Sequence, residues 1–284
     1  MLPDEAVLST LVYASLFKSA ISKQRLLDWL ISDTKISQKD VQKSVKHLLR
    51  RKLIFQDGDF LSLSRYVVVN QIQKRKTARE KVRRARDAIH SITWIPWITG
   101  IALTGSVAAE NANEDEDIDV MIITSKNALW ITRALVSTQL ALQGKLRLRH
   151  VPDVTNKLCL NLWLDESALV MKKQTAYVAR EVSQALWLFE RANTRKHFLQ
   201  ANAWITSFLA QVKIPKGTSL EQNFSFVFIN DFFYKVQRSW MGEISVKERV
   251  GKHFAFFHPG DKSSDLMREY RTRRKKILEE YHGI

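Results

Sequence analysis

The sequence predicts an α+β protein in which a mixed sheet with flanking helices lies between a helical amino-terminal part and a helical carboxyl-terminal domain. Two observations lead to this prediction. Apolar residues recur at helical spacing toward both ends of the chain, whereas short aliphatic runs typical of buried strands occur near its middle. We expect four parts, an amino-terminal domain, a basic linker helix, a mixed core and a helical domain, over residues 1–66, 67–93, 94–192 and 193–284.

Composition restricts the class of protein. The chain has 284 residues, of which 45% are hydrophobic and 26% are charged, the balance of an ordinary globular protein. Its single cysteine, Cys159, excludes an internal disulfide framework. The sequence has no apolar run of the roughly twenty residues that a membrane span needs, and its first residues lack the basic region of a signal peptide. We therefore expect a cytoplasmic protein without a membrane partner.

Charge is the unusual feature of the composition. The formal net charge is +16, from 45 Lys and Arg against 29 Asp and Glu, which indicates a polyanionic partner such as nucleic acid. Eight of the thirteen residues over 74–86 are basic, and a second basic cluster lies over 268–276. By contrast, six of the ten residues over 110–119 are acidic. A carboxylate cluster in a basic chain suggests a metal site beside a groove for a polyanion.

Three helical patterns and a hairpin signal occupy the first sixty-four residues. Ser37 and Asp40 have the capping-box spacing at the start of the third helix, and Asp57-Gly58 separates two β-rich runs. This order resembles a winged helix-turn-helix domain over about 4–64, which implies contact of the third helix with DNA or RNA. The basic residues expected on its outer face are Lys39, Lys43 and Lys46. A protein-binding module, or a basic face that is merely solvated, is the alternative.

A strongly basic helix is expected over 70–92. Its apolar residues form one narrow stripe at helical spacing: Ala78, Val82, Ala85, Ile89 and Ile92. Such a helix packs one edge against a domain and presents its other faces to phosphate. We expect nucleic-acid contacts from Lys74, Arg75, Lys76, Arg79, Arg83 and Arg84. A solvated linker helix is the alternative interpretation.

The segment 97–123 reads as strand, tight turn, acidic loop and strand. Gly105 and Ser106 in the turn lack bulk, so backbone amides and a hydroxyl could approach a triphosphate closely. Asp117 and Asp119 are two positions apart on a strand and therefore direct both carboxylates to the same face. Two carboxylates placed in this way can hold divalent ions for phosphoryl transfer.

This motif resembles that of the DNA polymerase β-like nucleotidyltransferase superfamily. Gly105-Ser106 is followed, eleven positions after the serine, by Asp117-x-Asp119 and then by aliphatic residues, and the resemblance extends over about 95–192. It implies an enzyme that uses Mg²⁺ or Mn²⁺ to move a nucleoside monophosphate from a nucleoside triphosphate to a hydroxyl group. Asp117 and Asp119 would be its catalytic metal ligands, and Gly105 and Ser106 would bind the nucleotide phosphates. An acidic surface loop with a chance Asp-Ile-Asp is the alternative.

The resemblance also implies a helix after the second strand, and the sequence has an amphipathic pattern over about 127–142. Four cations in this region and beyond it are candidates for contact with a triphosphate or nucleic-acid phosphate: Lys126, Arg133, Arg147 and Arg149. Among these we expect Arg133, on the helix itself, to bind nucleotide.

A third metal ligand is implied on the next strand, expected over 157–164. Its leucines alternate and leave the other face to Cys159, Asn161 and Trp163. The matching position carries Asn161, whose carbonyl can bind a metal ion but whose amide cannot accept a proton as a general base. Two acids flank the strand and could supply the missing carboxylate: Asp153 and Asp165.

The charge also bears on the acceptor. A transferase that modifies small molecules does not need a charge of +16, so we expect a nucleic-acid acceptor, with RNA, such as a tRNA-like end, ahead of DNA. The alternative from another class is a winged-helix nucleic-acid-binding regulator whose transferase domain senses nucleotide without turnover, which Asn161 favours. A toxin that modifies tRNA or protein is a further possibility among enzymes.

Overall fold

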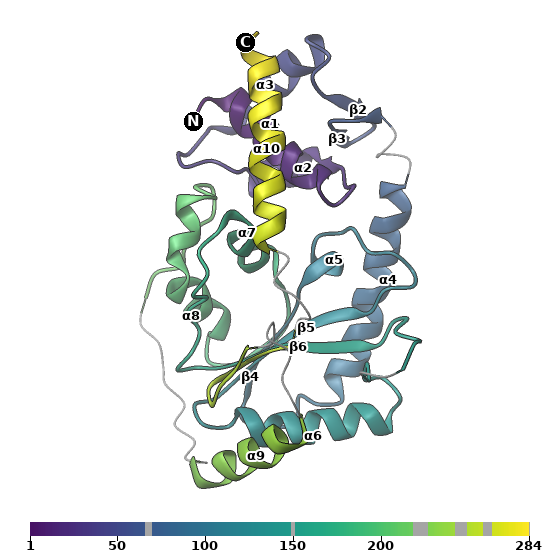
Figure 1. The fold of residues 1–284 in the computed structure, drawn as a ribbon, viewed down its shortest axis with the longest axis vertical. Helices are drawn as coiled ribbons and strands as arrows, with labels where there is room; N and C mark the ends of the chain where they lie inside the picture. Colours follow the sequence, from purple (N-terminus) through teal and green to yellow (C-terminus); the bar gives the residue numbers. More distant parts are fainter. Residues whose placement is uncertain (66–69, 149–150, 218–226, 242–248, 258–262, 284) are drawn as a thin grey trace.

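The structure is a computed structural model, and it describes residues 1–65, 70–148, 151–217, 227–241, 249–257 and 263–283. It is a mixed α+β fold, as predicted (Figure 1). Two expected features, the cation Arg149 and the beginning of the linker helix at 67–69, lie outside the described residues. In the part of the chain that the structure describes, no helix is long and apolar enough to cross a membrane.

The amino-terminal part consists of three helices and a small antiparallel sheet. The helices are α1 (Pro3–Ser15), α2 (Lys23–Asp28) and α3 (Gln38–Arg50), and the strands β1 (Ile21–Ser22), β2 (Phe55–Asp57) and β3 (Phe60–Ser62) have the order β1-β3-β2. The predicted start of the third helix is confirmed, since the Ser37 hydroxyl accepts a hydrogen bond from the Asp40 amide at 3.1 Å. The predicted hairpin turn is also present, with Gly58 at a φ of +54°.

Helix α4 (Gln71–His90) connects this part to the core. Its apolar stripe is buried as predicted, with Ala78, Ala85 and Ile89 each at most 3% exposed. The stripe packs against one face of the central sheet, which we call the first face. The helix is therefore an integral part of the core.

The central sheet has six strands in the order β7-β4-β5-β6-β9-β8 in the described residues. These are β4 (Ile98–Leu103), β5 (Ile118–Thr124), β6 (Leu158–Asp165), β7 (Leu186–Glu190), β8 (Arg249–Val250) and β9 (Phe254–Phe256). Strands β5 and β6 are parallel, and the other described pairs are antiparallel. The long connection from β5 to β6 contains α6 (Leu129–Leu142), as a parallel pair requires.

Two groups of helices cover the two faces of this sheet. The first face packs against α4, α6 and α9 (Val227–Trp240). The second face packs against α7 (Ala176–Gln184), α8 (Thr194–Ala201) and the short 3₁₀ helix Ala203–Ser207. Ile118 and Val120 belong to the first face, whereas Met121 and Ile123 belong to the second. Both layers of the core are therefore built on the strand that carries the acidic motif.

Residues 193–284, predicted as one helical domain, are instead distributed over the molecule. Helices α8 and α9 cover opposite faces of the sheet, β8 and β9 extend it, and α10 (Ser263–His282) packs against α1. The chain thus begins and ends at the same end of the molecule (Figure 1). Arg274 Nε donates to Ser9 Oγ at 2.8 Å, and the Tyr281 hydroxyl donates to Asp4 Oδ2 at 3.1 Å. Helical periodicity could not predict this packing, because the hydrogen bonds between α10 and α1 join residues more than 250 positions apart.

Candidate functional site

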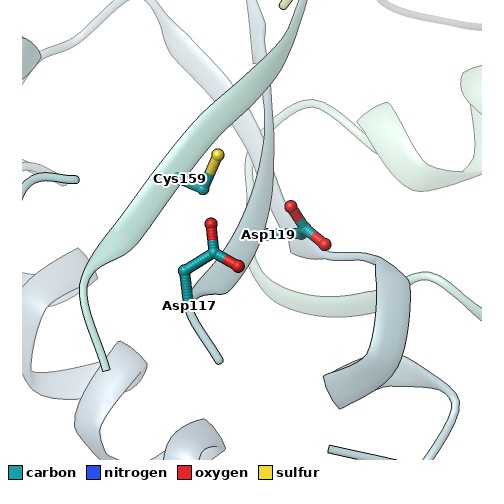
Figure 2. A group of neighbouring side chains, drawn as sticks. All are labelled: Asp117, Asp119 and Cys159. Carbon is teal, nitrogen blue, oxygen red and sulfur yellow. The ribbon is translucent and has the colours of Figure 1, made fainter. Parts of the chain in front are cut away.

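Asp117 and Asp119 lie at the beginning of β5, where the strand leaves the acidic loop. Ile118 and Val120 are 0% and 1% exposed on the first face of the sheet, which confirms that the aliphatic neighbours pack behind the two carboxylates. Asp119 is the Cα partner of Cys159 on the parallel strand β6. Figure 2 shows that both aspartates and Cys159 come together, and their ligand atoms lie within 4.8 Å of one another.

The turn after β4 places Gly105 directly against Asp119. Gly105 has a φ of +61°, in the left-handed region, and a Cβ atom added to it would lie 2.2 Å from Asp119 Oδ2. No other residue fits here without displacing that carboxylate. The structure therefore brings Gly105 together with the aspartates, and its amide lies 3.3 Å from Glu181 Oε2, to which it donates.

Ser106 lies next to this turn, but its hydroxyl has a partner in the acidic loop. Ser106 Oγ donates to Glu116 Oε2 at 2.8 Å, and the same carboxylate accepts hydrogen bonds from the Asn113 amide and side chain at 3.1 and 2.7 Å. The serine thus holds the loop that leads into Asp117. A phosphate that used the hydroxyl would replace Glu116 as its partner.

The carboxyl group of Asp119 lies in surroundings that oppose its ionisation. Burial, together with the nearby charges of Asp117 and Glu181, raises the pKa of Asp119 to about 7. Asn161 Nδ2 donates to Asp119 Oδ1 at 2.5 Å. Burial and the same two aspartates raise the pKa of the Cys159 thiol to about 12, so the thiol is neutral at physiological pH.

One cation lies against the group. Arg147 Nη1 donates to Asp117 Oδ2 and is 3.6 Å from Cys159 Sγ, while 39% of the arginine side chain is exposed. Sequence reasoning named Arg147 only as one of several cations near the motif. Its role as the partner of Asp117 depends on the position of the loop after α6, which no local pattern predicts.

A β-bulge decides which residue of β6 faces Asp119. The pairing passes from Asp119 opposite Cys159 to Met121 opposite Leu162, so β6 has one residue more than β5 over this stretch. One extra residue reverses the alternation of faces. The prediction that Trp163 shares a face with Cys159 is therefore wrong, because Trp163 is fully buried in the first-face core.

Cys159 is the third member of this group, and Asn161, which the sequence had matched to the third ligand, also contacts Asp119. Asn161 is 2% exposed and directs its NH₂ group to Asp119. Neither flanking acid supplies a third carboxylate. Asp165 lies six residues beyond Cys159 along the strand, roughly 20 Å away, where it pairs with His253 at 2.7 Å. Asp153 accepts a hydrogen bond from the Thr155 amide at 3.0 Å, and no described contact joins it to the aspartates.

Glu181 on α7 is a carboxyl group of the site that sequence reasoning did not select. Besides the Gly105 amide it accepts a hydrogen bond from Gln184 Nε2 at 2.7 Å, and burial raises its pKa. The sequence contains a weak signal for this position. The adjacent charges Arg180 and Glu181 lie between buried Ala179 and Val182, an unusual place for two charges on an amphipathic helix.

Arg133, expected to bind nucleotide, is not brought to this site. It lies on α6 against the first face of the sheet, whereas Asp119 points toward the second. Its Nη1 donates to Gln237 Oε1 of α9, and its guanidinium lies 4.7 Å from the centre of the Phe257 ring. The sheet itself separates Arg133 from the carboxylates.

The basic residues predicted to contact nucleic acid fall into two groups. Most of them are exposed, namely Lys39, Lys43 and Lys46 on α3, and Lys76, Arg79, Arg83 and Arg84 on α4. The other two, Lys74 and Arg75, face the acidic loop. Lys74 Nζ donates to Asn111 Oδ1 at 3.1 Å, and Arg75 Nε lies 3.0 Å from Glu110 Oε2. These two cations hold the molecule together and have protein partners.

Lys81, in the middle of the basic helix, is buried and has a structural role that its sequence context concealed. It is 1% exposed and donates to the backbone carbonyls of Glu114 and Glu116 at 3.1 and 2.5 Å, and to Asn156 Oδ1 at 3.2 Å. Burial lowers its pKa. The ammonium group thus fixes the end of the loop from which Asp117 projects.

Comparison with known proteins gave no match to any family model, curated protein or solved structure. The resemblance to nucleotidyltransferases therefore rests on the motif and its spacing. A function for this chain has to be argued from the geometry of the site.

Proposed function

We propose that the chain is a metal-dependent nucleotidyltransferase that moves a nucleoside monophosphate from a nucleoside triphosphate to a hydroxyl group of nucleic acid, with RNA as the favoured acceptor. One observation carries this proposal. Asp117 and Asp119 converge at the start of β5, beside a turn in which Gly105 admits no side chain. The order β4, Gly-Ser turn, β5, helix and parallel β6 supports the same assignment.

The two carboxylates suit Mg²⁺ or Mn²⁺. In sites for phosphoryl transfer, Mg²⁺ is bound through one or two carboxylates together with substrate phosphates, and here Asp117 and Asp119 would hold it. Burial and the neighbouring carboxylates raise the pKa of Asp119 to about 7, and a bound cation would lower it. When bound, the ion would neutralise charge on the transferring phosphoryl group.

The remaining residues would act mainly by position. The neutral Cys159 thiol and the Asn161 amide cannot serve as a general base near neutral pH. The proposal therefore assigns rate enhancement to alignment of the reactants and to charge neutralisation. Gly105 allows a close approach of the nucleotide to Asp119, and Ser106 would exchange Glu116 for a phosphate oxygen.

The acceptor is inferred from charge. The exposed cations of α3 and α4 supply many side chains that can neutralise phosphate, and the chain as a whole has a charge of +16. Phosphate contacts of this kind carry no base specificity by themselves. We therefore propose a polyanionic acceptor whose terminal hydroxyl group lies next to Asp117 and Asp119 during transfer.

Transfer of labelled nucleoside triphosphates tests the proposal directly. Each nucleotide is offered in turn with total RNA or with DNA ends, in Mg²⁺ or Mn²⁺, to the unaltered protein and to Asp117→Asn/Asp119→Asn. Asp115→Asn is the matched control, since Asp115 is an exposed acid of the same loop. We expect incorporation by the unaltered protein and by the control, and none by the double variant. Full incorporation by the double variant would refute the assignment.

A second function is favoured by a specific observation. Asp117 is paired with Arg147, and the Ser106 hydroxyl donates a hydrogen bond to Glu116. The third side chain of the group is Cys159, which is not a carboxylate. These contacts suit a winged-helix-like regulator that binds nucleic acid and senses nucleotide without turnover. In the same assay this alternative gives no incorporation, while nucleotide binding and salt-sensitive nucleic-acid binding are both retained.

A further inference from the structure

The position of β6 that faces Asp119 is a cysteine, and this changes the chemistry available at the site. Cys159 Sγ and one carboxylate oxygen from each of Asp117 and Asp119 lie within 4.8 Å of one another. The three side chains converge from the beginnings of two parallel strands (Figure 2). We propose that they form a site for a thiophilic divalent cation of the Zn²⁺ class, with Cys159 as the sulfur ligand.

The distances suit such an ion. With Zn–S bonds of about 2.3 Å and Zn–O bonds of about 2.1 Å, the ligand atoms of a tetrahedral site are roughly 3.4–3.6 Å apart. The three atoms lie within 4.8 Å already, so they need to approach one another by no more than roughly 1.4 Å. A movement of this size is on the scale of a change in side-chain rotamer. A fourth position remains for water or for a phosphate oxygen.

A cationic group of the chain itself already binds two of these three side chains. Arg147 Nη1 donates to Asp117 Oδ2 and lies 3.6 Å from Cys159 Sγ. This contact is independent of the spacing of the three ligands, and it shows that a positive charge is accommodated against both an oxygen and the sulfur. Because 39% of the arginine side chain is exposed, it can turn into solvent when an ion takes its place.

The sulfur determines the class of ion. Thiolate ligands favour Zn²⁺ and similar metals, whereas carboxylates alone suit Mg²⁺ and Mn²⁺. Binding would release the thiol proton of Cys159 to solvent, since the thiolate is the ligand. The inference rests on the proposed function in so far as the same two aspartates would hold Mg²⁺. It adds that a Zn²⁺-class ion competes for them and inhibits Mg²⁺-dependent transfer.

Cadmium alone, added to the 284-residue chain, is the probe. Cd²⁺ bound to a thiolate gives an ultraviolet charge-transfer band that carboxylate-bound Cd²⁺ lacks, and the chain has one cysteine, so the band reports Cys159. We expect a saturable band that is lost in Cys159→Ser. Zn²⁺ affinity in that variant should fall by at least roughly 10-fold, the smallest usual cost of removing a residue that only orients a metal ligand. Arg147→Gln should bind Cd²⁺ about two- to fivefold more tightly, because it removes a half-exposed ionic competitor.

A saturating Cd²⁺ titration without the band would overturn the inference, as would a folded Cys159→Ser protein with unchanged Zn²⁺ affinity. The unaltered protein provides a test that needs no variant. Alkylation of Cys159 should slow when Zn²⁺ is added, and an unchanged rate counts against the site. Mg²⁺-dependent transfer is measured separately. If transfer occurs but the Cd²⁺ band is absent, only the thiophilic site is refuted. If the band is present but no transfer occurs, only the proposed enzyme activity is refuted.

Discussion

The side chain of Asp119 is partly buried, lies near Asp117 and Glu181, and is held by the Asn161 amide. Of these influences burial is the largest, and together they raise its pKa to about 7. A carboxyl group in these surroundings costs folding free energy whenever it is ionised without a cation. Ionised Asp119 therefore lowers the stability of the folded protein. Perturbed ionisable groups of this kind are typical of functional sites.

The pH dependence of stability follows from this pKa. An unfolded aspartate has a pKa of about 3.9, so between pH 4 and 7 the folded protein holds one proton more than the unfolded chain at Asp119. The contribution of Asp119 to stability is therefore full below pH 4 and is lost as the pH rises through 7. Without added metal, Asp119→Asn should be more stable than the unaltered protein at pH 8, by up to about 4 kcal/mol.

Urea unfolding from pH 4 to 8 measures this difference, which should shrink toward pH 4. Asp115→Asn is the control, because that side chain is exposed. Parallel pH profiles for the unaltered protein and Asp119→Asn would contradict the argument.

Gly105→Ala should damage the site more than the fold. Its Cβ would lie 2.2 Å from Asp119 Oδ2, and its φ of +61° costs an alanine about 1–2 kcal/mol. Gly58→Ala is a matched control, since Gly58 has a φ of +54° but nothing within 4 Å of the added atom. Both variants should lose similar backbone stability, while Gly105→Ala alone should lose nucleotide transfer and metal binding. Equal metal binding by the two variants would argue against a role for close packing at this turn.

At the scale of elements, the acidic loop between α5 (Gly105–Ala108) and β5 is held by its neighbours along its length. Glu110 pairs with Arg25 and Arg75 at 3.1 and 3.0 Å. Lys81 binds the backbone near its end. Lys74, Arg75 and Lys81 of α4 thus contact the loop, whereas the basic residues on the outer side of the helix are exposed.

Lys81→Met tests this use of charge. The methionine preserves much of the buried volume but leaves the carbonyls of Glu114 and Glu116 without their donor, at a cost of about 1–3 kcal/mol. Lys76→Met, on the exposed side of the same helix, should change stability by less than about 0.5 kcal/mol. Chemical unfolding of both variants gives the comparison. A Lys81→Met protein as stable as Lys76→Met would show that the loop needs no buried cation.

For the whole molecule, the amino-terminal part is joined to the core by buried contacts. Arg180 of α7 is 4% exposed, donates to the Trp29 carbonyl at 3.1 Å and stacks 3.8 Å from the centre of the Trp29 ring. Gln71 accepts from the Ala20 amide and donates to the Glu110 carbonyl, both at 3.0 Å. Helix α10 packs along α1. The basic faces of α3 and α4 are therefore parts of one body with the carboxylates.

The salt dependence of RNA affinity distinguishes exposed cations that contact phosphate from cations that have protein partners. Each phosphate contact contributes roughly 0.7–0.9 to the slope of log affinity against log salt. Arg79→Gln/Arg83→Gln should therefore reduce the slope for RNA by roughly 1.4–1.8. Arg75→Gln is the comparison, because Arg75 pairs with Glu110. That variant should lower stability and leave the slope nearly unchanged. If the double variant has the same slope as the unaltered protein, these two side chains do not contact the RNA phosphates.

Much of the local structure follows from the sequence. The cap at Ser37, the hairpin at Gly58, the buried stripe of α4 and the shared face of Asp117 and Asp119 depend on residues within a few positions of one another. At this range the preferences of the backbone and the period of the apolar residues decide the conformation. The strand–turn–strand order of the motif was predictable for the same reason.

Only the tertiary structure decided what surrounds those carboxylates. A single-residue bulge in β6 sets Cys159 opposite Asp119 and turns Trp163 into the core, and a loop thirty residues from Asp117 supplies Arg147. Helix α10 likewise finds α1 across the length of the chain. Such contacts depend on strand register and on the packing of distant surfaces, where many pairings satisfy the same local pattern and only the complete core selects one.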